Sequence, residues 1–150
     1  MQKPVDISIV IPLLNEEQSL SPLNDWIFKV FNNQTLSFEL IYIDDGSTDE
    51  SWKSIVDLSK KYSNIKGIRF AKNFGKSQAL HAGFESANGK YVITLDADLQ
   101  DSPEEIPQLI KSLNEGGYDL ISGWKKKRFD SILFKNLPSK LFNWAARIVS

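Results

Sequence analysis

The chain has 150 residues, of which 41% are hydrophobic and 25% charged, as in globular domains large enough to bury a core. Its formal net charge of −1 excludes an overall basic surface, so we expect no nucleic-acid partner. Because cysteine is absent, disulfides, thiolate zinc sites and a cysteine nucleophile are excluded, which fits a reducing compartment. The apolar run at residues 7–14 is too short to span a bilayer.

Five short β-rich runs alternate with helical stretches along the chain. The predicted strands are Ile7–Pro12, Phe38–Ile43, Ile65–Phe70, Tyr91–Leu95 and Tyr118–Ser122. Several of these runs are almost continuously apolar, which is typical of strands with both sheet faces covered.

The four gaps between these strands carry apolar residues at helical spacing. Their predicted starts are, in chain order, Ser21–Pro22, a capping box of Ser47 and Glu50, Ser77, and a second box of Ser102 and Glu105. Strict alternation of strands and helices favours one α/β domain, a mostly parallel sheet with helices on both faces. In such a sheet, ligands bind beyond the carboxyl ends of the strands, near the point where the strand order reverses.

The segments that directly follow the predicted strands are therefore candidates for the site. In chain order they contain Asn15 and Glu16, then Asp44 and Asp45, then Lys72, Asn73, Gly75 and Lys76, then Asp96, Asp98, Gln100 and Asp101, and finally the basic run 125–128. Because the carboxyl ends of parallel strands share one edge of a sheet, we expect these polar side chains to converge there.

Asp96 and Asp98 form a D-x-D motif in which two carboxylates crowd at the end of a strand. A divalent cation relieves this crowding, because Mg²⁺ or Mn²⁺ takes one or two carboxylates together with phosphate oxygens and water. Gln100 offers a further oxygen ligand. The motif is short and common, so roles in a turn or a helix cap are the alternative.

The other strand-end residues also have structural alternatives. Asp45 can accept a hydrogen bond from a nucleobase or simply belong to the turn at residues 44–46. Glu16 can face a ligand or complement the dipole of the first helix, and the basic run 125–128 can bind phosphates or face solvent. Their joint placement at successive strand ends favours a shared ligand site.

Four segments at these positions together resemble family 2 glycosyltransferases with the GT-A fold: SIVIPLLNEEQSL, LIYIDDGSTDES, AKNFGKSQALHAGFESANGKYVITLDADLQDSPEEIP and DLISGWKKKRFD. The resemblance covers essentially the whole chain. It points to the dolichol-phosphate mannosyltransferase-like branch, which includes bacterial polyprenyl-phosphate glycosyltransferases. It implies a Rossmann-like sheet, of which residues 1–150 form the N-terminal part.

The resemblance also implies the residues of the site. The implied nucleotide-sugar-binding residues are Pro12, Leu14, Glu16, Ile43, Asp45, Asp96, Ala97, Asp98 and Lys125; the metal ligands are Asp96, Asp98 and Gln100; the catalytic residues are Asp98 and Lys125. Leu14 and Phe129 depart from the family, where relatives often carry Tyr and a polar residue. Leu14 lacks the aromatic ring that would stack on the base.

By this resemblance the protein is an inverting glycosyltransferase that uses Mg²⁺ or Mn²⁺ and a nucleotide-diphospho-sugar. The expected acceptor is a polyprenyl phosphate such as dolichyl or undecaprenyl phosphate, whose anionic oxygen needs no strong general base. This fits the single histidine, His81, which lies in the middle of a predicted helix. A saccharide hydroxyl is the alternative acceptor and requires a carboxylate base.

Two other classes fit parts of the pattern. A receiver-like phospho-acceptor domain also has an acidic pair, a strand-end Asp and a later Lys, but there the pair follows the first strand and the acceptor Asp the third. Here they follow the second and the fourth predicted strands. A nucleotide-binding module without catalysis is the other class.

Residues 131–150 carry apolar residues at helical spacing with interspersed Lys and Arg. The pattern fits an amphipathic segment at an anionic membrane surface and equally a helix that packs on the sheet. Members of the resembled family continue beyond this length, many with C-terminal membrane helices. We therefore expect a fragment of a protein at the cytoplasmic face of a membrane.

Overall fold

The computed structural model describes residues 4–32 and 34–123. The elements in chain order are β1 (Val5–Leu13), α1 (Glu17–Phe31), β2 (Phe38–Asp44), α2 (Ser51–Lys61), β3 (Ile65–Arg69), α3 (Lys76–Ser86), β4 (Gly89–Thr94), the short 3₁₀ helix η1 (Pro103–Glu105) and α4 (Ile106–Gly116). All of them belong to one structural unit that ends at Tyr118, and residues 119–123 belong to a second.

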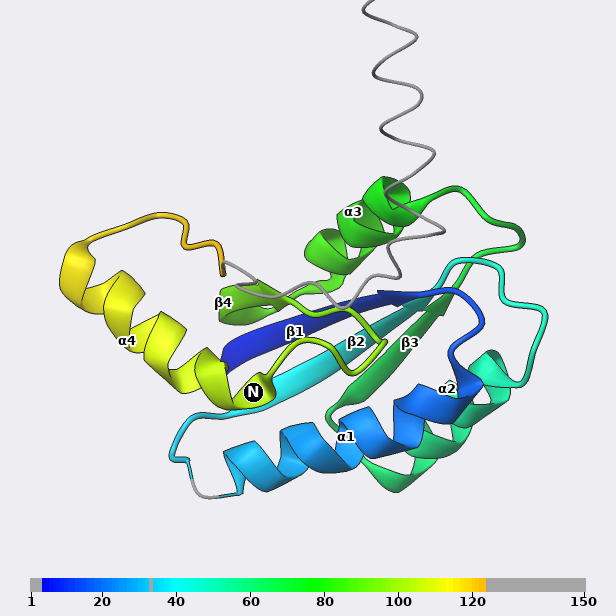
Figure 1. The fold of residues 1–150 in the computed structure, drawn as a ribbon, viewed down its shortest axis with the longest axis horizontal. Helices are drawn as coiled ribbons and strands as arrows, with labels where there is room; N and C mark the ends of the chain where they lie inside the picture. Colours follow the sequence, from blue (N-terminus) through cyan, green and yellow to red (C-terminus); the bar gives the residue numbers. More distant parts are fainter. Residues whose placement is uncertain (1–3, 33, 124–150) are drawn as a thin grey trace, which may run out of the picture. The chain divides into compact units, whose positions relative to one another are not determined.

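The four strands form one parallel sheet in the order β3-β2-β1-β4 (Figure 1). In register, Val10 of β1 lies between Ile41 of β2 and Thr94 of β4. The chain moves outward from β1 to β3 and then returns to the other side of β1 to form β4. The strand order therefore reverses at β1, and the carboxyl ends of β1 and β4 flank the switch point at which α/β sheets bind ligands.

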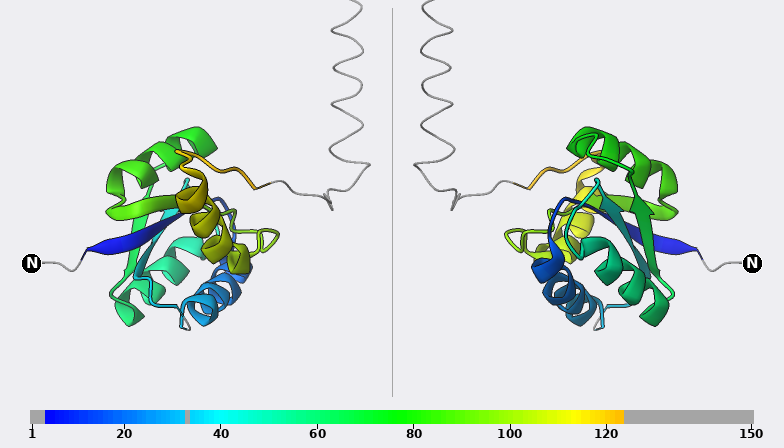
Figure 2. Two further views of the ribbon diagram at one scale, coloured as in Figure 1. Left: turned by 90° about the vertical axis from the view of Figure 1, so that its left-hand side faces the viewer. Right: turned by 90° about the vertical axis from the view of Figure 1, so that its right-hand side faces the viewer.

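Helices cover both faces of the sheet, as the sequence predicts; Figure 2 shows α3 on one face and α1 and α2 on the other. Side chains of β1 alternate between two cores because successive residues of a strand point to opposite faces. Ile9 and Ile11 pack into the core that includes Leu23 of α1, and Val10 packs with Ala79 of α3. The central strands β1 and β2 are thus buried between two layers, while β3 and β4 keep exposed residues.

The predicted fifth strand at residues 118–122 is wrong. These residues are not in a strand, and Leu120 is 83% exposed. The run has strand-like residue types, but such a preference is realised only when a neighbouring strand accepts the pairing and the side chains are buried. Gly117, with φ +61°, ends α4 in the left-handed conformation that glycine adopts readily.

Neither predicted capping box forms its side-chain hydrogen bonds, although η1 begins directly after Ser102, at the predicted start. α2 begins at Ser51, and the Ser47 hydroxyl instead accepts a hydrogen bond from the backbone N–H of Asn15 at 2.9 Å. The Ser102 hydroxyl donates to the carboxylate of Glu104 at 2.8 Å. In both cases the hydroxyl that the capping pattern assigns to a backbone N–H of the helix bonds to another group: the Asn15 N–H for Ser47 and the Glu104 carboxylate for Ser102.

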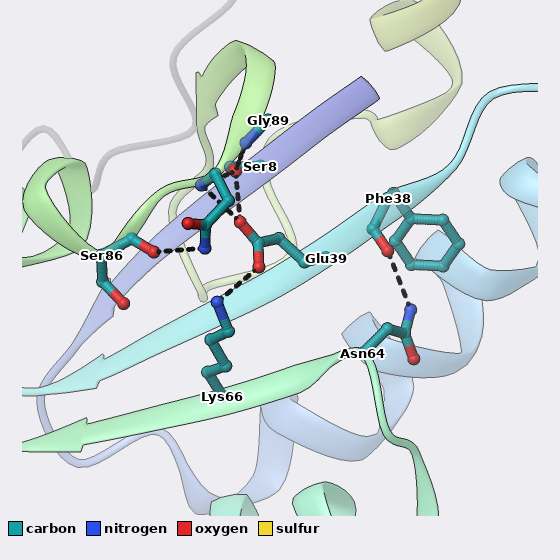
Figure 3. A network of polar contacts seen from close by, with 8 residues as sticks. Ser8, Phe38, Glu39, Asn64, Lys66, Ser86 and Gly89 are labelled. Atoms are coloured by element: carbon teal, nitrogen blue, oxygen red, sulfur yellow. Dashed lines mark hydrogen bonds and ion pairs between the residues drawn. The ribbon is translucent and has the colours of Figure 1, made fainter. Parts of the chain in front are cut away.

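A buried carboxylate joins three strands at the amino-terminal edge of the sheet, opposite the switch point (Figure 3). Glu39 of β2 is 4% exposed, and its Oε1 accepts hydrogen bonds from the Ser8 hydroxyl at 2.6 Å and the Asn88 N–H at 2.7 Å. Its Oε2 lies 2.7 Å from Nζ of Lys66 on β3. The Gly89 N–H donates to Ser8 at 2.8 Å, so the network fixes the start of β4.

Burial by itself would raise the pKa of Glu39, but the hydrogen bonds from Lys66, Ser8 and the Asn88 N–H outweigh it and hold this pKa below its usual value. Because the folded-state pKa is lowered, the ionised carboxylate stabilises the fold above the pKa of an unfolded Glu. This stabilisation is lost as the pH falls through the folded-state pKa.

Glu39→Gln is expected to lower the free energy of unfolding by about 2 kcal/mol at neutral pH, since it removes the charge from a buried hydrogen-bonded network. Denaturant unfolding at several pH values measures this, and the difference from wild type should shrink below pH ~4. Glu85→Gln is the matched control, because the Glu85 side chain is 73% exposed. An equal loss of stability in the two variants would contradict the assigned role of Glu39.

Candidate functional site

A cleft of about 320 Å³ opens at the carboxyl edge of the sheet, at the predicted switch point. It is lined by residues from the ends of β1, β2 and β4 and from the start of α3. They are Pro12, Leu13, Leu14, Glu16, Asp45, Asn73, Gly75, Lys76, Ala79, Asp96, Ala97 and Asp98. The structure therefore brings together most of the residues that the sequence predicts for a nucleotide-sugar site.

The loop after β1 is held against the loop after β2 by hydrogen bonds in both directions. Asn15 takes the left-handed conformation, with φ +57°, and its side-chain oxygen accepts from the Thr48 N–H at 2.8 Å. The Asn15 N–H donates to Ser47, and the Glu16 N–H donates to the Ser51 hydroxyl at 2.9 Å. These bonds fix the backbone on both sides of Glu16, whose side chain lines the cleft.

Asp45 joins the end of β2 to the start of α3. The side chain is 5% exposed, and its two oxygens accept the N–H groups of Phe74 at 2.7 Å and Gly75 at 2.9 Å. Gly75 has φ +95°, a conformation that residues with a side chain rarely adopt, and it directly precedes the first residue of α3. Asp45 therefore positions Lys76, while its nucleobase contact stays a prediction.

Lys76 compensates part of the acidic charge at the end of β4. Its Nζ forms an ion pair with Oδ1 of Asp96, and both side chains line the cleft. The backbone N–H of Asp96 donates to Asp101 at 3.0 Å. The sequence places Lys76 in a strand-end segment but does not show that it reaches Asp96, because the contact depends on where α3 begins.

Asp98 lies in a tight turn beyond β4. Its Oδ1 accepts from the Gln100 N–H at 3.1 Å, and Leu99 between them has φ +62°. This Asx-type turn holds the carboxylate of Asp98 at the cleft. Gln100 is exposed and is not among the cleft-lining residues, so its role as a metal ligand stays a prediction.

The donor set at this cleft fits a cation that is completed by a ligand. Within the residues that the structure describes, no cluster of three or more His, Cys, Asp or Glu side chains is placed to hold a metal by itself. Mg²⁺ and Mn²⁺ do not need such a cluster, because they bind one or two carboxylates together with phosphate oxygens and water. Asp96 and Asp98 supply two carboxylates of this kind.

Other predicted residues lie elsewhere. Ile43 is fully buried and packs with Val10 and Ala79 between the sheet and α3, so the structure does not bring its side chain to the cleft. Lys125 and the segment 131–150 lie outside the described residues. Across residues 4–32 and 34–123, none of the helices combines the length and the apolar character that crossing a bilayer requires.

Comparison with known proteins gives a family and several relatives. The family model described as "Glycosyl transferase family 2" matches residues 8–148. An undecaprenyl-phosphate 4-deoxy-4-formamido-L-arabinose transferase of Photorhabdus laumondii is 42% identical over 138 residues, 91% of this chain and 42% of the relative. A dodecaprenyl-phosphate galacturonate synthase of Rhizobium johnstonii is 34% identical over 145 residues, 93% of this chain and 42% of the relative.

Among solved structures, glucosyl-3-phosphoglycerate synthase of Mycobacterium tuberculosis, in complex with Mn²⁺, UDP and glucosyl-3-phosphoglycerate, has a TM-score of 0.57 and 27% identity. The match covers 73% of this chain and 39% of that one. The chain spans about 42% of the length of the two curated relatives. The residues that the family model matches, 8–148, include every residue that lines the cleft.

Proposed function

Since the chain belongs to glycosyltransferase family 2, we propose that it serves to transfer a sugar from a nucleotide-diphospho-sugar to a polyprenyl phosphate, with inversion at the anomeric carbon. The observation that carries the proposal is the cleft at the switch point. It collects Asp45, Asp96 and Asp98 from the ends of β2 and β4 around one opening. The names of the two polyprenyl-phosphate relatives support the class of acceptor.

The charge of the cleft supports a divalent cation as part of donor binding. Within residues 4–32 and 34–123, its lining carries four carboxylates and the single ammonium of Lys76, a net charge of −3. A diphosphate is itself an anion, so this cleft repels it until a cation enters. Asp98 and Asp96 would hold Mg²⁺ or Mn²⁺, and the bound cation would supply positive charge to the diphosphate leaving group. The Mn²⁺ in the mycobacterial structure supports this choice of metal.

The remaining lining residues suit a nucleotide. Pro12 and Leu14 form an apolar rim, and Leu14 is 40% exposed, so it can contact a base without an aromatic ring. The buried carboxylate of Asp45 keeps free lone pairs beside its two backbone contacts and can accept a base N–H. Ala97 also lines the cleft, between Asp96 and Asp98 in the sequence, while it belongs to the buried core. We place Lys125 among the further donor contacts by resemblance alone.

A polyprenyl phosphate acceptor agrees with the groups at the cleft. The phosphate oxygen is already anionic, so the attack needs no strong general base. The histidine of the chain, His81, lies on α3 with 69% of its side chain exposed, 3.7 Å from Glu85, and does not line the cleft. Because polyprenyl phosphates are membrane lipids, we propose that the protein works at the cytoplasmic face of a membrane, where such lipids present their phosphates.

The alternative of a receiver-like phospho-acceptor domain has no support, because the chain belongs to glycosyltransferase family 2.

The proposal predicts sugar transfer to a lipid phosphate. The purified protein, with Mn²⁺ and a panel of UDP- and GDP-sugars, is offered undecaprenyl phosphate in detergent, undecaprenol, and soluble saccharides. We expect a glycolipid product only with the phosphorylated lipid, because only this acceptor carries an anionic oxygen. Transfer to saccharides alone would establish the hydroxyl-acceptor alternative, and nucleotide binding without any transfer would indicate a binding module.

A further inference from the structure

We propose that Lys76 is an exchangeable counter-ion of Asp96. It neutralises this carboxylate before a divalent cation binds, and it turns to the phosphates of the nucleotide once the cation has taken its place. The inference rests on the proposed function, because it requires a cation and a diphosphate in the same cleft.

The exposure of the ion pair makes the exchange feasible. Lys76 Nζ contacts Asp96 Oδ1, and the two side chains are 59% and 38% exposed. Ion pairs of this exposure are weak, since water screens both charges. A divalent cation competes successfully for such a carboxylate, because it brings twice the charge and binds through direct coordination.

The backbone around Lys76 is held much more firmly than its side chain. Asp45 binds the N–H groups of the two preceding residues, and the Gly75 carbonyl accepts from the Gln78 N–H at 3.0 Å within the first turn of α3. The four-carbon side chain of a lysine can nevertheless swing about this fixed point. Lys76 can therefore leave Asp96 and remain within the same cleft.

The charge of the cleft gives Lys76 two opposing effects. Among the described residues that line the cleft, it is the single cationic side chain, against four carboxylates. Before nucleotide binds, its ammonium opposes the entry of a cation and occupies Asp96. After the cation and the diphosphate have bound, the same ammonium is a phosphate partner. A purely structural ion pair would have neither effect on binding.

Calorimetry can separate the two effects in wild type, Lys76→Met and Lys76→Arg. Each protein is titrated with Mn²⁺ alone, and then, at saturating Mn²⁺, with UDP or GDP, whichever the wild type binds more tightly. We expect Lys76→Met to bind Mn²⁺ alone about three- to fivefold more tightly, the scale of an exposed ion pair. We expect it to bind the diphosphate about tenfold more weakly, and Lys76→Arg to restore diphosphate binding.

Lys72→Met is the matched control, because Lys72 lies in the same loop with its ammonium 5.3 Å from the Phe74 ring centre and is not among the cleft-lining residues. It should bind as the wild type does. Thermal unfolding checks that the variants fold. If Lys76→Met does not fold, Lys76→Gln replaces it in the same two titrations, with the same expected results.

The outcomes distinguish this inference from the proposed function. A wild type that binds neither Mn²⁺ nor a nucleoside diphosphate contradicts both. A wild type that binds both, with Lys76→Met unchanged in either titration, overturns the role of Lys76 and leaves the proposed function standing.

Discussion

Replacing Asp98 with alanine is expected to lower the rate of sugar transfer about 10²- to 10³-fold, the scale on which single charge-stabilising contacts act in transition states. Asp98 is held at the cleft by the turn that its own carboxylate forms with the Gln100 N–H. The variant lacks the carboxylate that we propose as a ligand of the cation, so the remaining activity should depend only weakly on Mn²⁺. Initial rates measured against Mn²⁺ concentration give both quantities.

Asp57→Ala serves as the control for this experiment, because Asp57 lies on the exposed face of α2 with its side chain 63% exposed. In the described part of the chain, its one ion pair is with Lys60, three residues further along the helix. It also removes one carboxylate, but far from the cleft, and should retain wild-type rates. Full turnover of Asp98→Ala with the wild-type dependence on Mn²⁺ would rule out the metal assignment.

Asp45→Ala is expected to weaken the binding of nucleoside diphosphate about 100-fold and to lower the free energy of unfolding by ~3 kcal/mol, since each charge-assisted hydrogen bond of a buried carboxylate contributes about 1.5–3 kcal/mol. The substitution leaves the N–H groups of Phe74 and Gly75 without their acceptor. The start of α3 then loses its anchor, and Lys76 loses its fixed position beside Asp96. Denaturant unfolding and calorimetry measure the two effects.

Asp45→Asn provides a graded comparison. It keeps the size of the side chain and one oxygen acceptor, so one of the two backbone contacts can persist. We expect values between those of wild type and Asp45→Ala in both measurements. If Asp45→Ala instead kept wild-type stability and nucleotide affinity, the carboxylate would not be the link between β2 and α3.

The sheet and the position of the cleft could be predicted from sequence because they follow from short local patterns that recur along the chain. Apolar runs such as residues 7–13 mark strands that are covered on both faces, and alternation with helices leaves few topologies other than a parallel sheet. Once the strands are parallel, their polar ends must share one edge. For this reason Glu16, Asp45, Asp96 and Asp98 appear together in the cleft as expected.

Contacts between segments distant in sequence could not be predicted in this way. Lys76 and Asp96 are 20 residues apart, and their ion pair depends on the start of α3, which Asp45 fixes from a third segment. The local pattern predicts that the Ser47 hydroxyl caps a helix, but this hydroxyl accepts from the Asn15 N–H, a donor 32 residues away in the sequence. The family resemblance implies that Ile43 binds the nucleotide-sugar, yet its side chain packs in the core under α3.

The central claim is that a cation and a nucleoside diphosphate bind at the carboxyl edge of the sheet, between the ends of β1, β2 and β4. Mn²⁺ broadens the NMR signals of nearby nuclei, so amide spectra recorded with Mn²⁺ and UDP or GDP locate the ion directly. The account predicts selective loss of the signals of Asp96, Ala97 and Asp98, while those around Glu39 at the opposite edge persist. Persistence of the signals at the cleft, or broadening centred on another part of the chain, would contradict it.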